Sequence, residues 1–186
     1  AIINGSGAGD WQGCLELINV KYVKIDSLYI KYSGGANVRG ILCRNCTNLL
    51  IVNNIIVSNR LEGIRAGDGS ANPIAYSVFS NNKCNYNDRI NWDWPSGIVL
   101  NRAYSNRIID NECIKNGTGA GNGNGIRIEE CSLYNLIKGN NCSSNYRRGI
   151  DFRDEGAGTE NRYNTVRDNI VSYNSRDGIA GEGYPG

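Results

Sequence analysis

The segments DNECIKNGTGAGNGNGI, residues 110–126, and GNNCSSNYRRGI, residues 139–150, share one pattern. Each contains an Asn, a Cys two residues later, a second Asn five residues after the first, and then a Gly-Ile pair. The two Asn positions return along the chain at intervals of 28 or 29 residues. A fixed period of this length predicts a solenoid in which each repeat forms one coil and stacks on the previous one.

Two columns of asparagine are therefore expected along the solenoid axis. Equal positions in consecutive coils lie about 4.8 Å apart, the spacing of hydrogen-bonded strands. Asn side chains at this spacing can bond to one another through their amides, and Asn tolerates the left-handed backbone of a bend. The first column comprises Asn54, Asn82, Asn111, Asn140 and Asn169, and the second comprises Asn59, Asn87, Asn116, Asn145 and Asn174.

The Gly-Ile pairs mark a strand in each coil. After Gly125 the sequence IRIE, residues 126–129, alternates apolar and polar side chains, which predicts a strand with one buried face. No segment has a sustained helical stripe. We predict an all-β chain: a single-stranded right-handed parallel β-helix of about six to seven coils with an internal Asn ladder. It occupies residues 14–186, after an N-terminal extension, residues 1–13, that could be a strand donated to a neighbour.

Composition excludes several kinds of function. The chain has 20 Lys and Arg against 18 Asp and Glu, whereas nucleic-acid binders usually have a basic surplus. No apolar run reaches the length of a membrane span, so no membrane insertion is expected. His is absent, which excludes a Ser-His-Asp triad, a Cys-His dyad and His-ligated zinc. Acid–base chemistry would have to use Asp, Glu, Lys, Arg, Tyr or Cys.

The cysteines are interpreted mainly as core residues. Cys84, Cys113 and Cys142 share the 29-residue phase, so their side chains should stack inside the coils. Parallel side chains at strand spacing are poorly oriented for a disulfide, and a buried column of free thiols is expected instead. Cys43 and Cys46 form a lone Cys-x-x-Cys pair, which is weak evidence for metal or redox chemistry without further ligands.

A family resemblance follows from these segments together with NNIIVSNRLEGI, residues 53–64, and RDNIVSYNSRDGI, residues 167–179. They resemble the parallel β-helix repeats of the pectin-lyase-like superfamily, particularly its NosD and carbohydrate-binding or sugar-hydrolase group, over roughly residues 14–180. The resemblance implies the fold but not one function. The same repeat serves polysaccharide lyases, epimerases, glycosidases, phage tailspikes, adhesins and accessory proteins.

Charged side chains point outward from the Gly-Ile strands and form one stripe along the solenoid. Neighbouring coils should place Arg127 against Asp151 and Glu129 against Arg153, as cross-strand ion pairs. This stripe is either a solvated, salt-bridged surface or a saccharide groove. Superfamily enzymes that this chain resembles act on the corresponding face with acidic residues, sometimes calcium, and a Lys or Arg base.

The resemblance therefore assigns candidate roles to this stripe. No lyase or epimerase signature is visible in the sequence, so it leaves open whether the chain is an enzyme; if it is, a polysaccharide lyase or glycoside hydrolase is expected. No cofactor is expected, although these acids could bind calcium. The catalytic candidates are Asp151, Arg127, Arg153 and Glu129, and the candidate calcium ligands are Asp151, Asp154 and Glu130.

Long loops beside the stripe suggest where a sugar would bind, because insertions on one face of a solenoid often mark its binding face. The loop NDRINWDWPS, residues 87–96, contains two Trp residues around an Asp. Trp rings suit the apolar faces of sugars, although one of them could simply cover the coil edge. The candidate substrate-binding residues are Trp92, Asp93, Trp94, Arg65 and Asn101.

Two functions remain open at this stage. The first is an extracellular or surface β-helix that binds, and could process, a polysaccharide at the charged groove. The second is a structural module of a fibre, filament, adhesin or tailspike, with copies stacked end to end because open coils expose unpaired strand edges. Four Asn-x-Ser/Thr sequons weakly favour a location outside the cytoplasm. The candidate glycosylation sites are Asn4, Asn45, Asn116 and Asn141.

Overall fold

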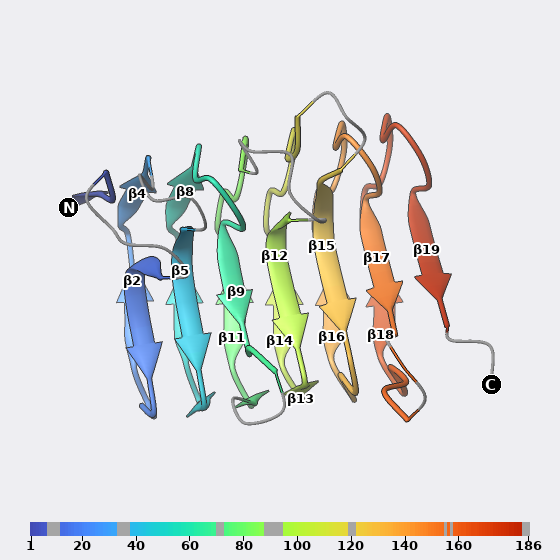
Figure 1. The fold of residues 1–186 in the computed structure, drawn as a ribbon, viewed down its shortest axis with the longest axis horizontal. Coiled ribbons are helices and arrows are strands. Elements are labelled where there is room, and N and C mark those ends of the chain that lie inside the picture. The colour runs from blue at the N-terminus through green and yellow to red at the C-terminus, as the bar shows by residue number, and fades with distance from the viewer. Residues whose placement is uncertain are drawn as a thin grey trace.

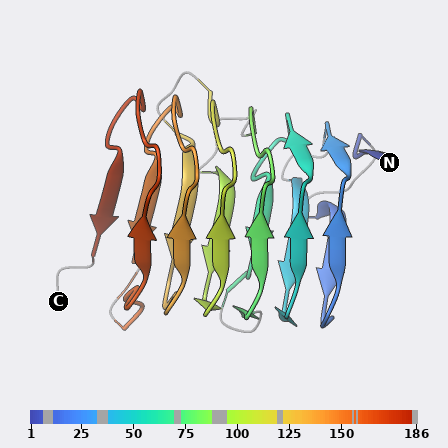
Figure 2. The same ribbon diagram turned by 180° about the vertical axis from the view of Figure 1, so that it is seen from behind.

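The chain forms a parallel β-solenoid of about six coils, which stack in sequence order from one end of the molecule to the other (Figure 1). Figure 2 shows the opposite side, where a second sheet runs along the same axis. The computed structural model describes residues 1–6, 12–32, 38–69, 73–87, 95–118, 122–154, 156 and 158–183. There is no helix in these ranges, and hence none long and apolar enough to cross a membrane.

The Gly-Ile segments form a seven-stranded parallel sheet, as predicted. Its order is β19-β17-β15-β12-β9-β5-β2, so each coil adds one strand. Alternate residues of these strands are apolar and face the core, where Ile41, Ile98 and Ile126 are fully buried. The strands are β2 (Gly13–Ile18), β5 (Arg39–Arg44), β9 (Ile64–Ala66), β12 (Ser96–Asn101), β15 (Asn124–Glu129), β17 (Ile150–Arg153) and β19 (Ile179–Glu182).

The opposite side of the solenoid is a six-stranded parallel sheet in the order β18-β16-β14-β11-β7-β3. Its strands are short, and each places one central apolar residue inside, such as Phe79 or Ile108. The strands are β3 (Lys24–Asp26), β7 (Leu50–Val52), β11 (Val78–Ser80), β14 (Arg107–Ile109), β16 (Leu136–Lys138) and β18 (Thr165–Arg167).

Two three-stranded sheets complete the described coils, with the orders β1-β4-β8 and β13-β10-β6. In the first, Ile2 and Ile3 pair in parallel with Tyr29 and Ile30. In this structure, the N-terminal extension therefore adds a strand to its own solenoid. The strands are β1 (Ile2–Asn4), β4 (Tyr29–Lys31), β8 (Ile55–Val57), β6 (Cys46–Thr47), β10 (Ile74–Ala75) and β13 (Ala103–Tyr104).

The expected asparagine columns both form. Asn111 Nδ2 donates to Asn140 Oδ1 at 3.0 Å, and Asn111 Oδ1 accepts from the backbone N–H of Asn82 at 2.9 Å. The second column makes the same bonds, for example from Asn116 Nδ2 to Asn145 Oδ1 at 3.1 Å. Each Oδ1 therefore accepts from both the side chain and the buried backbone N–H of the Asn in the preceding coil, so the buried polar groups of both coils have partners.

A third ladder runs five residues before the first and was not expected from the sequence. Asn106 Nδ2 donates to Asn135 Oδ1 at 3.0 Å, and Asn135 Nδ2 donates to Asn164 Oδ1 at 2.9 Å. Ser77 occupies the same place in the preceding coil, where its N–H donates to Asn106 Oδ1. Three ladders at five-residue spacing divide this half of each coil into short, equal segments.

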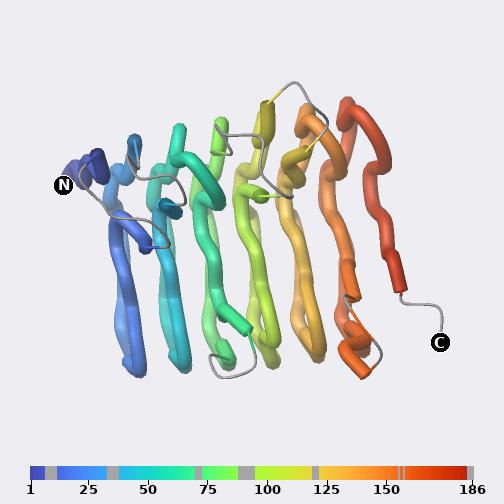
Figure 3. Tube along the Cα trace, in the orientation of Figure 1, coloured from blue at the N-terminus to red at the C-terminus, as the bar shows by residue number. Residues whose placement is uncertain are grey.

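Each of these segments ends at a residue with left-handed backbone. One corner column has Tyr22, Asn48, Tyr76, Ser105, Tyr134 and Tyr163, with φ between 52° and 59°. Another has Tyr32, Ser58, Tyr86, Lys115, Ser144 and Tyr173, with φ between 55° and 59°. Bulky residues rarely adopt this conformation. The corners are visible as sharp bends of the trace in Figure 3, and all the tyrosines of these two columns are exposed.

The interior contains the expected column of thiols. Cys84, Cys113 and Cys142 are fully buried and free, so this prediction is confirmed. Burial raises the pKa of the Cys113 thiol well above its usual value, since a thiolate would be poorly solvated there. Cys43 and Cys46 are also buried and free, which places the Cys-x-x-Cys pair in the core.

The glycine of each Gly-Ile pair allows its strand to approach the second Asn ladder closely. At Gly97, an added Cβ would lie 2.8 Å from the Gly125 carbonyl oxygen, 2.9 Å from the Cys84 carbonyl oxygen and 3.0 Å from Asn116 Nδ2. Real Cβ atoms essentially never approach backbone oxygens this closely. The absence of a side chain at this position is therefore a packing requirement of the coil.

Candidate functional site

The outward face of the seven-stranded sheet carries the charged stripe in the expected register. Arg127 is the Cα partner of Asp151, and Glu129 is the partner of Arg153. The carboxylates nevertheless have different ionic partners from those predicted. Asp151 is held by Arg148 and Arg147, and Glu129 by Arg65 and Arg127, so contacts along the same strand and across two coils replace the neighbouring-coil pairs.

Glu62 and Glu129 are the centres of a buried ionic network at the middle of this face. Glu62 Oε2 lies 3.0 Å from Arg39 Nε, and its Oε1 lies 3.0 Å from Arg65 Nη1. Arg65 continues to Glu129, with Nη2 3.4 Å from Oε2, and so spans the intervening coil. Glu129 Oε1 lies 2.9 Å from Arg127 Nε. Both carboxylates are more than nine-tenths buried.

The network keeps the Glu62 carboxylate charged. Burial alone would raise the pKa of Glu62, but the guanidinium groups of Arg39 and Arg65 outweigh it and hold that pKa below its usual value. Burial alone would lower the pKa of Arg65, and the charges of Glu129 and Glu62 raise it instead. A carboxyl group held in this way is unsuited to donate a proton as a general acid.

The carboxylate of Asp151, the main catalytic candidate, is also paired with arginines. Its side chain is fully buried, with Oδ1 2.7 Å from Arg148 Nη1 and Oδ2 3.8 Å from Arg147 Nη1. Asn124 Nδ2 donates to Oδ2 at 3.4 Å. Arg148 further contacts Glu182, whose pKa it lowers through a hydrogen bond. Two arginines thus contact the Asp151 carboxylate.

The three carboxylates proposed as calcium ligands do not converge. Glu130 pairs with Arg102, Nε to Oε2 at 3.1 Å. Asp154 Oδ1 accepts from the backbone N–H of Asn161 at 2.9 Å and from its Nδ2 at 2.6 Å, which caps a loop. Within the described ranges, no group of three or more acidic or cysteine side chains could hold a metal ion.

The remaining candidate residues lie in different environments. Arg65 belongs to the ionic network, and Asn101 Nδ2 donates to Glu129 Oε2 at 3.0 Å. Among the sequons, Asn4 and Asn45 are exposed and Asn141 is half-buried, but Asn116 is fully buried in the second ladder and inaccessible for glycosylation in the folded chain. Trp92, Asp93 and Trp94 lie outside the described residues.

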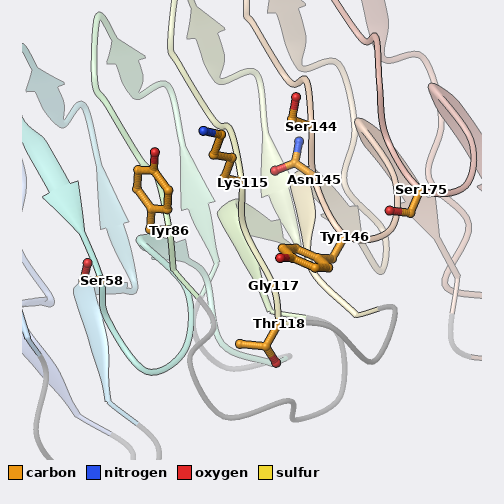
Figure 4. Close-up of a pocket in the computed structure, with 9 residues that line it drawn as sticks. All are labelled: Ser58, Tyr86, Lys115, Gly117, Thr118, Ser144, Asn145, Tyr146 and Ser175. Atoms are coloured by element: carbon orange, nitrogen blue, oxygen red, sulfur yellow. The ribbon is translucent and has the colours of Figure 1, made fainter.

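A groove of about 600 Å³ lies at a different place, along the corner that leads into the Gly-Ile strands. Figure 4 shows Tyr86, Lys115 and Ser144 in one row across successive coils, with the Tyr146 ring beside Gly117. Tyr86 is 51% exposed and Tyr146 is 41% exposed. The remaining lining residues are Ser58, Thr118, Asn145 and Ser175.

Local packing arranges these side chains. The Lys115 ammonium lies 5.5 Å from the centroid of the Tyr86 ring, a cation–π contact. A Cβ at Gly117, whose φ is 102°, would lie 2.8 Å from Tyr146 Cβ and 2.0 Å from the Asn122 carbonyl oxygen. Glycine at this position therefore allows the neighbouring coil to approach, and leaves the Tyr146 ring at the surface of the groove.

The sequence contained a signal for this groove. Ser58, Tyr86, Lys115 and Ser144 each directly precede an Asn of the second ladder, so they must form a column of their own. What the period could not indicate is that this column faces solvent at a left-handed corner. That depends on the cross-section of the coil rather than on its repeat length.

Comparison with protein families supports the fold. The model of the family described as "Right handed beta helix region" matches residues 3–184. The chain belongs to this family. The predicted right-handed parallel β-helix is thereby confirmed. Comparison of this right-handed β-helix with curated proteins found no significant match.

Two solved structures are similar to this right-handed β-helix. A mutant of the periplasmic alginate epimerase AlgG has a TM-score of 0.58 and 14% sequence identity, over 92% of this chain and 46% of that one. The A-module of a mannuronan C-5 epimerase of Azotobacter vinelandii has a TM-score of 0.48 and 15% identity, over 92% and 56%. This chain spans about half the length of either structure. At this identity the likeness shows the fold alone.

Proposed function

We propose that this β-helix binds a polysaccharide along the corner groove of Tyr86, Lys115 and Tyr146, without catalysing a reaction on it. The observation that carries the proposal is the groove itself. Two tyrosine rings and a lysine ammonium are exposed there among the hydroxyl groups of Ser58 and Ser144. Its volume of about 600 Å³ lies in the range of ligand pockets in proteins.

The chemistry of the lining suits sugars. A tyrosine ring offers an apolar face to the C–H face of a pyranose, and its hydroxyl group remains available for hydrogen bonds. Serine and threonine hydroxyls can both donate to and accept from sugar hydroxyls. The Asn145 amide already serves the second ladder, where its Nδ2 donates to Asn174. Recognition would therefore fall to the tyrosines, Lys115 and the hydroxyl groups.

The lining favours an extended ligand. Its residues come from five successive coils, from Ser58 to Ser175, and five coils span about 19 Å at the usual strand spacing. A sugar chain lying parallel to the solenoid axis would contact all of them, whereas a monosaccharide would contact only one or two. We therefore propose a polymer as the ligand.

The charged face supports binding rather than catalysis. Hydrolysis of a glycosidic bond uses two carboxyl groups, one of them protonated, across the scissile bond. Here Glu62, Glu129 and Asp151 are each enclosed by arginines. The same face is the scaffold on which the groove corner is fixed.

A location outside the cytoplasm is part of the proposal. One of the similar structures is a periplasmic alginate epimerase and the other is an epimerase that acts on mannuronan. Both names concern acidic polysaccharides. These likenesses support a sugar polymer as a class of ligand but do not select one.

The proposal is tested by titrating the purified chain with alginate and dextran oligosaccharides of matched length. Tyr86→Asn together with Tyr146→Ser should weaken binding at least tenfold, which corresponds to about 1.4 kcal/mol. Asn is chosen at residue 86 because it tolerates the left-handed backbone. Tyr22→Asn is the matched control, an exposed left-handed tyrosine at another corner. Equal binding by all three proteins would refute the groove.

A second proposal, stacking of copies end to end, has one observation in its favour. Ile179 is 51% exposed, although it pairs with Ile150, in a column whose earlier members Ile126 and Ile150 are fully buried. Stacking on this surface would pair the outer edges of β18 and β19. A concentration series in sedimentation tests this: a shift toward dimers or longer species supports stacking, and a monomer throughout contradicts it.

A further inference from the structure

Tyr134 and Tyr163 lie at the corner just before strands β16 and β18 of the six-stranded sheet, and their rings form an exposed stack. The rings of Tyr134 and Tyr163 are 5.0 Å apart with an interplanar angle of 11°. The residues are 59% and 68% exposed, so little of the stack is buried by the fold. Both residues have left-handed backbone, with φ of 59° and 57°, where Asn or Gly would be less strained. The fold gains little from tyrosine at these two positions.

The strands that follow the stack present an unfavourable pair of charges. Lys138 on β16 and Arg167 on β18 are direct Cα partners and point from the same face. Like charges placed directly opposite each other destabilise a sheet. Arg107, on the adjacent strand β14, adds a third cation; it is exposed, as is Arg167, whereas Lys138 is half-buried. Within the described part of the chain, none of the three forms an ion pair.

The same sheet shows the alternative arrangement in its first coil. There Lys24 Nζ lies 2.6 Å from Asp26 Oδ2, so the outward cation has its own carboxylate. In the later coils the column of Asp26 is occupied by Lys138 and Arg167 instead. Asp110 and Asp168 stand at the next corner, and neither pairs with these cations in the described contacts.

We propose that this face, with the Tyr134–Tyr163 stack and the Lys138–Arg167 pair, is a second binding site, which takes an acidic polysaccharide. The rings provide a stacking surface for a pyranose, and the cations provide partners for carboxylate or sulfate groups. The left-handed backbone at the two tyrosines and the pairing of like charges both lower the stability of the free chain. An acidic ligand would relieve the repulsion between Lys138 and Arg167.

The geometry sets the size of the ligand. Lys138 is four residues beyond Tyr134 along an extended segment, a distance of about 13 Å. A single sugar on the rings would not reach the cations. An oligosaccharide of several units, lying along the strands and therefore across the solenoid axis, would contact both. The groove described above follows the axis instead, so the two sites differ in direction and in charge.

The test uses protein in which the groove is disabled by Tyr86→Asn and Tyr146→Ser. In this background, alginate oligosaccharide should still bind, dextran of equal length should bind at least tenfold more weakly, and added NaCl should weaken alginate binding because exposed charges are screened. Tyr134→Asn with Tyr163→Asn should reduce alginate binding at least tenfold. Lys138→Ser with Arg167→Ser should do the same, and Tyr22→Asn should not.

The outcomes separate this site from the groove. Loss of all alginate binding in the groove-disabled protein, with unchanged thermal unfolding, overturns the second site and leaves the groove intact. Alginate binding that is insensitive to both double substitutions on the sheet also overturns it. A single-stranded DNA oligonucleotide that binds as tightly as alginate would show a general polyanion surface and would equally contradict the proposal.

Discussion

The first Asn ladder offers a quantitative test of what holds the coils together, through the substitution Asn111→Ala. Asn111 Oδ1 accepts from the backbone N–H of Asn82 at 2.9 Å. Its Nδ2 donates to the Phe79 carbonyl at 2.9 Å and to Asn140 Oδ1 at 3.0 Å. All of these groups are buried, so water cannot replace the lost amide without entering the core.

The expected loss follows from these bonds. Leaving the buried N–H of Asn82 without an acceptor costs about 1–3 kcal/mol, and losing two further bonds costs about 0.5–1.5 kcal/mol each. The free energy of unfolding should therefore fall by about 2–6 kcal/mol, a large part of the ~5–15 kcal/mol typical of a folded domain. Urea unfolding followed by circular dichroism measures it.

Asn169→Ala is the matched control for that prediction. Asn169 is the last member of the same ladder and is only partly buried, so water can satisfy the groups that its removal exposes. Its loss should be about 1 kcal/mol, the net worth of a solvent-replaceable hydrogen bond. Equal losses for the two variants, or a loss below 1 kcal/mol for Asn111→Ala, would refute the reasoning.

Four further outcomes are expected. Gly97→Ala should lower the free energy of unfolding by about 1–3 kcal/mol in urea, because its Cβ would overlap backbone oxygens; an unchanged value contradicts the packing argument. The folded chain should lose stability as the pH falls below the unfolded-state pKa of glutamate, about 4.3, because the pKa of Glu62 is lowered in the fold and its stabilisation is lost when it protonates. Glu62→Gln should flatten that pH dependence of the melting temperature, and an identical profile would show that Glu62 is not involved. Tyr173→Asn should leave the melting temperature unchanged or raise it, since this exposed tyrosine has left-handed backbone; a drop of several degrees would reveal packing that the structure does not show. Cys113 should react with a disulfide reagent only after unfolding, because its thiol is buried and its pKa is raised; labelling of Cys113 itself in the folded chain would contradict the buried column, whereas the partly exposed Cys14 and Cys131 can react.

The sequence period predicted most of the architecture. Asn54 to Asn169 and Cys84 to Cys142 lie in columns because equal positions in a solenoid must stack, and the hydrogen bonds follow from that stacking. The Gly-Ile strands pair in the register that alternation indicated, down to Arg127 beside Asp151. These features depend only on the repeat and on strand periodicity.

The ionic partners on the charged face could not be predicted in the same way. Arg65 reaches Glu129 across two coils, and Asp151 forms an ion pair with Arg148, three residues before it in the sequence. The ionic partners of long side chains depend on side-chain length and burial, and a repeat period in the sequence indicates neither. The groove at Tyr86 was missed for a related reason, because corner geometry decides which ladder neighbours face solvent.

A crystal structure of the chain with a bound alginate oligosaccharide would test the central claim, that sugars bind at the tyrosine corners rather than on the charged sheet. The account predicts sugar rings along the groove, with one over Tyr86 or Tyr146 and a carboxylate near Lys115. Density over the seven-stranded sheet, with sugar carboxylates bound to Arg65 or Arg127 and the corner groove empty, would contradict it.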